Sequence, residues 1–321
     1  FPFLGPKREG KARDIYQFSP DAWFLISTDR QSAFDISWCT IPLKGHVLNA
    51  LSTWWFQKVT DILPTHVLAV PDPNVTIIKP LRMIPIEIVV RAYLTGSTQT
   101  SIWHHYKNGG RHFCGNPLPS GMVRNQPLPS ILITPTTKSD AHDEPIDRAM
   151  IIERRLATSA QWEEIMHAAL RLFHHGQIVA AERGLILVDT KYEMGYDNEG
   201  HLTLADEVHT PDSSRYWIAD TYQQRFRNGE EPESLDKEFF RLWLKEQGYL
   251  QDGPRPIITD EVRLHLAEKY VALAERMTGE PFLLPSPHDI LGRIERNLRS
   301  FLQSSPTLQT CLSASYASGG S

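Results

Sequence analysis

Segment 184–217 places ionisable side chains inside a pattern that is otherwise typical of a buried strand. A strand alternates its side chains with a period of two, so one face can pack while the other does chemistry. The face expected to pack carries Ile186, Val188, Thr190, Tyr192 and Met194. The opposite face changes from Leu185 and Leu187 to Asp189, Lys191 and Glu193. Two carboxylates flanking an amine on one face predict an active site.

A hairpin is expected to bring another carboxylate to this face. Residues 197–200 (Asp-Asn-Glu-Gly) form a turn signal and 202–208 fit the returning strand, so Glu193 lies roughly opposite Asp206. Glu193 and Asp206 can hold Mg²⁺ through their oxygens, while Lys191 neutralises phosphate charge. The alternative is a solvated sheet face on which Lys191 forms ordinary cross-strand ion pairs.

Four further segments carry groups that can bind anions or sugars. Residues 210–215 (Thr-Pro-Asp-Ser-Ser-Arg) supply hydroxyls, a carboxylate and a guanidinium that suit a ribose and a phosphate. Residues 10–14 place a glycine and a lysine at the start of a strand, where the backbone can approach a phosphate. Residues 91–97 can hold an anion, and a lysine within 134–144 can reach a nucleotide phosphate. Taken singly, residues 10–14 also fit a solvated hairpin end, residues 91–97 a tight turn and residues 134–144 a polar loop.

Composition bounds the class of protein. The 321 residues, 41% of them hydrophobic, can bury a sizeable core and divide into two or three lobes. A net charge of -5 argues against a nucleic-acid partner and favours a metabolite. Cys39, Cys114 and Cys311 are widely separated, which favours a reducing, cytoplasmic setting. We expect a soluble protein without a membrane partner, because no apolar run approaches about 20 residues and no signal peptide is recognised.

The elements that must position these groups follow from periodicity and turn signals. Strands are predicted at 12–18, 23–27, 76–78 and 85–93, with a helix at 47–59. Prolines and glycines predict an irregular lid or insert over 108–131. Helices are predicted from the capping box at 158–161 toward residue 184, over 235–246 and over 261–277. The Ser/Gly-rich residues 304–321 are expected to be a flexible tail.

Histidines near one cysteine raise the alternative of a zinc site. The group comprises His104, His105, His112 and Cys114. It does not have the paired spacing of a structural zinc site, so this alternative has little support.

Six ordered motifs resemble those of the SAICAR synthetases (phosphoribosylaminoimidazole-succinocarboxamide synthetases) of purine biosynthesis. They are GKARDIY at Gly10, STDRQSAFD at Ser27, IPIEIVVRAYLTGS at Ile84, TPTTKSDAHDE at Thr134, LILVDTKYEMG at Leu185 and ADEVHTPDSSRYW at Ala205. SLDKEFFRLWL at Ser234 also matches, so the resemblance covers nearly the whole folded chain. The length resembles the longer, single-function form of the family.

The resemblance implies an ATP-dependent ligase. Such an enzyme joins L-aspartate to 5-aminoimidazole-4-carboxylate ribonucleotide through an acyl phosphate. The implied fold is α+β. An amino-terminal antiparallel β domain (1–107) precedes an ATP-grasp-like α+β lobe with the catalytic hairpin (108–230), a carboxy-terminal helical region (231–303) and the tail (304–321). The implied partners are small-molecule substrates, with ATP and Mg²⁺ required and no obligate protein partner evident.

The resemblance also assigns roles to individual residues. Catalysis is assigned to Lys191, Asp189 and Arg215. ATP binding is assigned to Lys11, Ala12, Arg13 and Lys138. Substrate binding is assigned to Arg91, Ser97, Asp212, Ser213, Arg215 and Asp35, and metal binding to Glu193 and Asp206.

Two alternatives from other classes stay open at this point. A nucleotide-binding regulatory protein would keep the cleft without turnover, and a small-molecule kinase would use the same lysine and metal. Neither alternative requires an amine substrate, so dependence of turnover on L-aspartate discriminates between them and the ligase.

Overall fold

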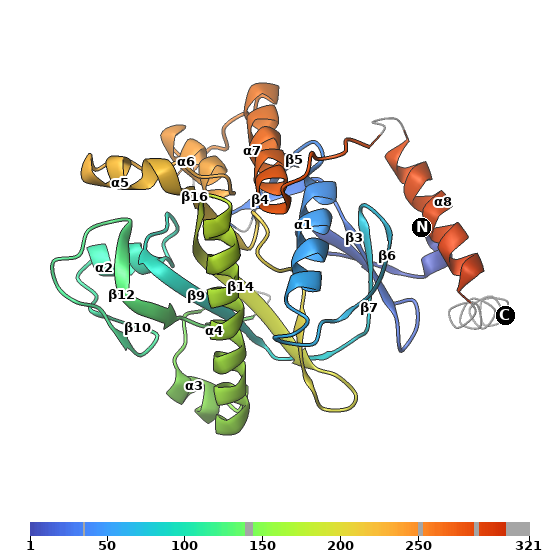
Figure 1. The fold of residues 1–321 in the computed structure, drawn as a ribbon, viewed down its shortest axis with the longest axis horizontal. Coiled ribbons are helices and arrows are strands. Elements are labelled where there is room, and N and C mark those ends of the chain that lie inside the picture. Colours follow the sequence, from blue (N-terminus) through green and yellow to red (C-terminus); the bar gives the residue numbers. More distant parts are fainter. Residues whose placement is uncertain (35, 139–143, 250–252, 286–288, 306–321) are drawn as a thin grey trace.

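The computed structural model describes residues 1–34, 36–138, 144–249, 253–285 and 289–305. Helices and antiparallel strands are mixed within these residues, which confirms the α+β class expected from the sequence. The strands form two larger sheets, and helices pack on both (Figure 1). No helix in the described part of the chain is both long and apolar enough to cross a membrane.

The first sheet has five strands in the order β1-β2-β3-β7-β6. They are β1 (Lys7–Glu9), β2 (Arg13–Tyr16), β3 (Trp23–Ser27), β7 (Val75–Ile78) and β6 (Val67–Asp72). Helix α8 (Ile290–Ser304) packs on this sheet, where Phe24 and Ile26 of β3 share an apolar cluster with Leu298. Phe24 and Ile26 are two residues apart and therefore lie on one face of the strand.

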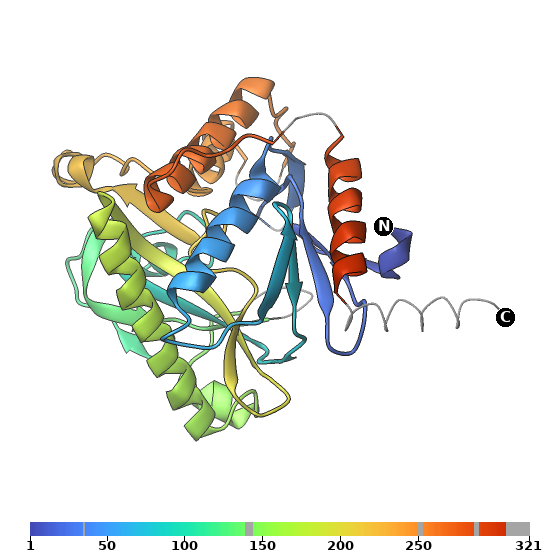
Figure 2. The ribbon, with the colours of Figure 1, turned by 45° about the vertical axis from the view of Figure 1, so that its right-hand side comes forward.

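Polar contacts also fix α8 to the first sheet. Arg293 donates from Nε and Nη2 to the buried Asp72 carboxylate at 3.1 and 3.2 Å, and from Nη2 to Asn74 Oδ1 at 2.6 Å. Asn297 Nδ2 donates to Asp72 at 2.7 Å. Figure 2 shows α8 beside this sheet and apart from α7 (Asp260–Thr278), which precedes it in the sequence.

The second sheet is organised around one long strand, β14 (Leu185–Tyr196). Its main order is β12-β9-β14-β15, while β13 also pairs with β9, and β8 and β16 also pair with β14. These partners are β8 (Arg82–Met83), β9 (Ile86–Leu94), β12 (Gln126–Ile133), β13 (Thr136–Thr137), β15 (Leu202–Ala205) and β16 (Ser214–Ile218). Helix α4 (Ser159–Glu182) lies along β14 (Figure 1). Side chains of β14 therefore meet residues from several distant segments.

Two small hairpins and further helices complete the described structure. The hairpins pair β4 (Arg30–Ala33) with β5 (Ile36–Thr40) and β10 (His112–Phe113) with β11 (Asn116–Pro117). The helices are η1 (Pro2–Leu4), α1 (Lys44–Lys58), α2 (Ile102–Lys107), α3 (Arg148–Glu153), α5 (Ala219–Arg227) and α6 (Glu238–Glu246). Helices α1, α4 and α7 share the main core with the second sheet through Trp55, Phe173 and Tyr270.

Local signals gave several helix ends correctly. The Thr158 hydroxyl and the Gln161 side chain form the predicted capping box of α4. Thr259 caps α7, and Gly279 ends it with a φ of 78°. The predicted starts of α1 and α6 were wrong by about one turn, since these helices begin at Lys44 and Glu238, but their predicted ends agree with the structure to within one residue.

The prediction of an irregular segment over 108–131 was wrong in part. Strands β10 and β11 form a hairpin there, and β12 begins at Gln126. Strand β12 lies at the edge of its sheet and its register shifts between Pro127 and Leu132. An edge strand tolerates prolines because one side of it forms no ladder hydrogen bonds.

The predicted face pattern of β14 was also wrong over its first half. Leu187 packs in the main core together with Tyr192 and Met194, whereas Val188 packs in a separate cluster with Trp217. The register with β16 shifts between residues 187 and 189. Such a bulge moves the alternation by one residue, so odd positions face the core before it and even positions after it.

The expected lobe boundaries stay a prediction. The boundary at 107 falls between β9 and β14, which pair directly. Helix α8 lies on the first sheet although its sequence falls in the expected helical region. Residues 306–321 of the expected tail lie outside the described residues.

Candidate active site

Arg13 links the first sheet to the hairpin of β14 and β15. Its Nη1 lies 2.6 Å from Asp206 Oδ1, and its Nη2 lies 3.0 Å from Glu207 Oε1. Asp206 directly follows β15 and has a φ of 62°, a left-handed conformation that aspartate tolerates better than most residues. The turn at the end of β15 therefore presents two successive carboxylates to one guanidinium.

The charges of this group stabilise one another. Burial alone would lower the pKa of Arg13, but Asp206 and Glu207 outweigh burial and raise it. Burial alone would raise the pKa of Asp206, but Arg13 and Lys191 hold it well below its usual range. Asp206 is therefore an ionised carboxylate at neutral pH, as a metal ligand or phosphate-site partner must be.

Lys191 lies between two carboxylates of the second sheet. Its Nζ is 2.8 Å from Glu87 Oε1 and 2.7 Å from Glu193 Oε1. Lys138 forms an ion pair with the other oxygen of Glu193. Burial would lower the pKa of Lys191, but the charges of Glu193 and Glu87 raise it well above its ordinary value. Lys191 is therefore a permanent cation here and not a proton acceptor.

The donor set suits Mg²⁺ in chemical type. Glu193 and Asp206 offer hard oxygen donors, and the charge of Lys191 acts on both carboxylates. The hairpin pairs Glu193 with Ala205, so Asp206 is one position from the predicted facing place. In the structure each carboxylate is paired with a cation. The described residues contain no ready-made group of three or more His, Cys, Asp or Glu for a metal, which also gives the zinc alternative no support.

A second charged group surrounds Asp189. The register of the second sheet places Asp189 opposite Arg91 on one neighbouring strand and Arg215 on the other. Asp189 Oδ2 lies 3.0 Å from Arg91 Nη1 and 2.6 Å from Arg215 Nη1. Arg215 Nη2 also lies 3.2 Å from Glu238 of α6. Arg91 and Arg215, here called the arginine pair, thus place two guanidinium groups at one buried carboxylate.

Burial affects the two members of the arginine pair differently. It lowers the pKa of Arg91, whose neighbour Arg215 adds repulsion. For Arg215 the charges of Asp189 and Glu238 outweigh burial and raise the pKa. Burial alone would raise the pKa of Glu238, but the charges of Arg215 and Arg241 lower it to about 2. Two guanidinium groups beside such anchoring carboxylates can bind a phosphate or carboxylate ligand.

Ser97 lies in the loop between β9 and α2. It is buried, and its backbone carbonyl accepts a hydrogen bond from Lys245 of α6. The preceding Gly96 has a φ of 115°, and a Cβ there would come within 2.5 Å of the Ser101 side chain. Only glycine fits this tight loop, which holds Ser97 near Glu238.

Asp212 and Ser213 lie in the turn before β16. The Asp212 carboxylate contacts Lys44 of α1 and Tyr270 of α7 at 2.8 and 2.7 Å. The Ser213 hydroxyl accepts a hydrogen bond from the backbone N–H of Thr210 at 3.2 Å. The turn is therefore held by its own hydroxyls and by two helices.

The remaining predicted residues lie nearer the solvent or outside the description. Lys11 is exposed between β1 and β2, and the Ala12 carbonyl accepts hydrogen bonds from the Thr28 backbone and hydroxyl at 2.9 Å. Lys138 is 48% exposed at its side chain. Asp35 lies outside the described residues, so its role stays a prediction.

The structure thus brings most of the predicted residues into three sets, which lie on the second sheet, in the turns beside its strands and, for Arg13, on β2 of the first sheet. One contains Arg13, Lys138, Lys191, Glu193 and Asp206, the second contains Arg91, Asp189 and Arg215, and the third contains Asp212 and Ser213. Sequence reasoning missed their partners Glu87, Glu207, Glu238, Lys44, Lys237 and Tyr270. The alternation in Ile-Glu-Ile at 86–88 could have indicated Glu87, but the other contacts depend on tertiary structure.

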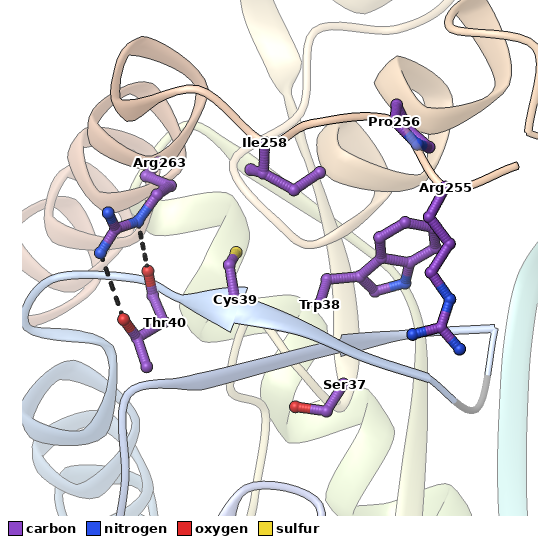
Figure 3. A pocket seen from close by; sticks show the side chains of 8 residues that line it. All are labelled: Ser37, Trp38, Cys39, Thr40, Arg255, Pro256, Ile258 and Arg263. Atoms are coloured by element: carbon purple, nitrogen blue, oxygen red, sulfur yellow. Dashed lines mark hydrogen bonds between the residues drawn. The ribbon is translucent and has the colours of Figure 1, made fainter.

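The described hollows of about 380 to 480 Å³ do not coincide with these charges. A hollow of about 380 Å³ lies between β5 and the segment that leads into α7, lined by Trp38, Cys39, Arg255 and Arg263 (Figure 3). A narrow recess of about 10 Å³ does touch Arg13, Asp206 and Glu207. Ion pairs fill the space between the charged groups, which explains why shape alone would not identify this site.

Asp236 gives the first testable prediction. Burial raises its pKa to about 7, outweighing the hydrogen bonds that the Glu238 and Tyr216 backbones donate to it. A carboxyl whose pKa rises on folding from 3.8 stabilises the fold fully below about pH 4, and that contribution is lost as the pH rises through about 7. The free energy of unfolding of the Asp236→Asn variant should therefore rise relative to that of wild type between about pH 5 and pH 8. Urea unfolding at both values measures this difference.

Asp220 is exposed, so the Asp220→Asn variant provides the control for the Asp236 measurement. Its stability difference from wild type should stay constant between the two pH values. If the Asp236→Asn difference were equally constant, burial would not be perturbing this carboxyl.

Known proteins are similar to this chain in both sequence and fold. The SAICAR synthetase family model matches residues 7–256. A phosphoribosylaminoimidazole-succinocarboxamide synthase of Legionella pneumophila (strain Lens) is 48% identical over 303 residues, which cover 94% of this chain and 96% of that protein. A SAICAR synthase from Saccharomyces cerevisiae, solved in complex with SAICAR, has a TM-score of 0.75 at 29% identity and covers 88% of this chain and 97% of its own.

A third likeness concerns a nucleotide complex. A SAICAR synthetase solved with ADP has a TM-score of 0.66 at 28% identity, covering 87% of this chain and all of its own. Fold, charged groups and relatives together define an enzyme of the ligase class. The family model spans more than half of the sequence, and the Legionella relative is similar over almost its full length. The chain belongs to the SAICAR synthetase family, which catalyses a step of purine biosynthesis.

Proposed function

We propose that this enzyme joins L-aspartate to 5-aminoimidazole-4-carboxylate ribonucleotide with ATP, giving SAICAR, ADP and phosphate. Two solved relatives, one with SAICAR and one with ADP, support these ligands. The observation that carries the proposal is the adjacency of two charged groups on β14. Lys191 and Glu193 belong to one group and Asp189, between the arginine pair, belongs to the other.

The chemistry needs charge compensation at a phosphoryl group. A carboxylate resists attack by an amine, so one of its oxygens first attacks the γ-phosphorus of ATP and ADP leaves. The neutral amine of aspartate then attacks the acyl carbon, phosphate leaves, and the nitrogen loses one proton to water. Glu193 and Asp206 would hold Mg²⁺, which would supply positive charge to the phosphoryl oxygens.

The residues of the first sheet and of the 134–144 segment suit the ATP end. Lys11 and Lys138 are accessible lysines, which can reach phosphate oxygens as point charges. Arg13 orients Asp206 through its 2.6 Å ion pair. Gly10, two residues before Ala12, has no side chain, so the backbone there allows close approach.

The second sheet suits the ribonucleotide. In this proposal Arg91, Ser97 and Arg215 bind its 5′-phosphate, and Lys191 pairs with the carboxylate to be activated. Asp189 is only 3% exposed, so it acts by holding the arginine pair in place. Asp212, Ser213 and Asp35 complete the proposed contacts to the sugar and base.

A direct assay tests this proposal. With ATP, Mg²⁺ and the carboxylate ribonucleotide present, sustained ADP release is expected only after L-aspartate is added, because the acyl phosphate needs an amine acceptor. SAICAR should appear in step with ADP, as measured by chromatography of the products. Cytoplasmic location and the absence of an obligate protein partner form part of the same proposal.

Two results would overturn it. Sustained ADP formation without aspartate, accompanied by a stable phosphorylated product, would identify a small-molecule kinase. Nucleotide binding without turnover under any combination of substrates would identify a regulatory protein.

A further inference from the structure

The Asp212 carboxylate is held by side chains from three helical regions. Its Oδ1 accepts a hydrogen bond from the Tyr270 hydroxyl at 2.7 Å. Its Oδ2 lies 2.8 Å from Lys44 Nζ and 3.6 Å from Lys237 Nζ. Only 7% of the Asp212 side chain is exposed, and Lys44 is fully buried. Such a costly arrangement of buried charges is built around one carboxylate.

The two lysines do not fix the rotation of the Asp212 carboxylate. Both act on Oδ2, and Lys44 also donates to the backbone carbonyl of Arg30 at 2.7 Å. A carboxylate held at a single oxygen can still turn about its Cβ–Cγ bond, since that torsion has a broad energy profile. The hydrogen bond from Tyr270 to Oδ1 fixes the plane of the carboxylate.

Tyr270 is suited to donate this hydrogen bond. It is fully buried in the main core, where α7 packs against α1. Burial and the neighbouring charge of Asp212 both raise the pKa of Tyr270 well above its ordinary value. Its hydroxyl therefore keeps its proton over the whole working range of pH. Helix α7 lies beyond residues 7–256, the part of the chain that the family model matches.

We propose that Tyr270 is a positioning residue for the ribonucleotide site, which orients the Asp212 carboxylate so that its free lone pairs accept a hydrogen bond from a sugar hydroxyl. This inference rests on the proposed function, in which Asp212 contacts the sugar or base. It gives α7 a part in substrate binding in addition to its packing role.

The variant Tyr270→Phe tests the proposal, because it removes the hydroxyl and keeps the ring. We expect the KM for the ribonucleotide to rise about tenfold, the effect of one lost hydrogen bond to a charged group. The kcat and the KM for ATP should stay within about twofold. A purely structural role would lower the melting temperature without this selective change in KM.

Tyr196→Phe is the matched control. The Tyr196 hydroxyl also donates to a carboxylate, Glu164, at 3.0 Å, and neither residue belongs to the three sets of the candidate site. It should leave every KM unchanged. Equal kinetic effects in the Tyr270→Phe and Tyr196→Phe variants would overturn the proposal, as would an unchanged KM in Tyr270→Phe.

A double-mutant cycle adds a second measurement. If Tyr270 acts through Asp212, then Tyr270→Phe should change the ribonucleotide KM less than about twofold in an Asp212→Asn background. Full additivity would show that Tyr270 acts by another route. If Asp212→Asn does not fold, the contrast between Tyr270→Phe and Tyr196→Phe still tests the positioning role of Tyr270. Failure of the proposed function is distinguished by the wild-type enzyme, which would then form no SAICAR at all.

Discussion

Replacing Glu193 by glutamine is expected to lower kcat about a hundredfold, because a fixed charge at the reacting phosphoryl group contributes on this scale. Glu193 accepts from both Lys138 and Lys191, and it is a proposed Mg²⁺ ligand. The amide keeps the shape of the side chain and loses its charge. Steady-state SAICAR formation over a series of Mg²⁺ concentrations measures the effect, and half-maximal activity should require more Mg²⁺ than in wild type.

Glu164→Gln separates this effect from the loss of a hydrogen-bonded carboxylate elsewhere in the fold. Glu164 of α4 accepts a hydrogen bond from Tyr196 at 3.0 Å and lies outside the charged groups of the site. Its activity and Mg²⁺ dependence should match wild type. Full turnover of Glu193→Gln at the wild-type Mg²⁺ concentration would remove Glu193 from the proposed site.

Asp189→Asn is expected to cause the largest loss of stability, about 3 kcal/mol in the free energy of unfolding. The substitution leaves two buried guanidinium groups without the carboxylate between them, although Arg91 keeps its 2.9 Å hydrogen bond to Thr134. Urea unfolding measures the change.

The exposed pair of Arg148 and Glu163 provides the control for Asp189→Asn. Its nitrogen and oxygen are 3.0 Å apart, as in the Arg91–Asp189 pair, but the two side chains are 55% and 46% exposed. Glu163→Gln should cost less than about 1 kcal/mol, since water and salt screen the pair. Equal losses in the two variants would mean that burial does not set the strength of these interactions.

The sequence predicted best those features that depend on neighbouring residues. The capping box at Thr158 and the Thr259 and Gly279 ends of α7 are determined within one helical turn, and the structure confirms them. The hairpin of β14 and β15 follows from a turn signal and alternation, so Glu193 and Asp206 were expected close together. The motifs identified the family because they preserve such local patterns.

The errors and omissions arose where distant segments determine the outcome. A bulge on β14 depends on its register with β16, so alternation alone placed Leu187 and Val188 on the wrong faces. The prolines of β12 are compatible with a strand only because it is an edge strand. Tyr270 and Asp212 are 58 residues apart, and no sequence period connects them.

The placement of α8 on the first sheet has a consequence for the nascent chain. The five strands of that sheet are complete once residue 78 has been synthesised, but the helix that covers Phe24 begins at residue 290. At about 5–20 residues per second, the ribosome leaves this apolar face uncovered for roughly 10–40 s. During translation the apolar face of these strands therefore stays uncovered until α8 has been synthesised.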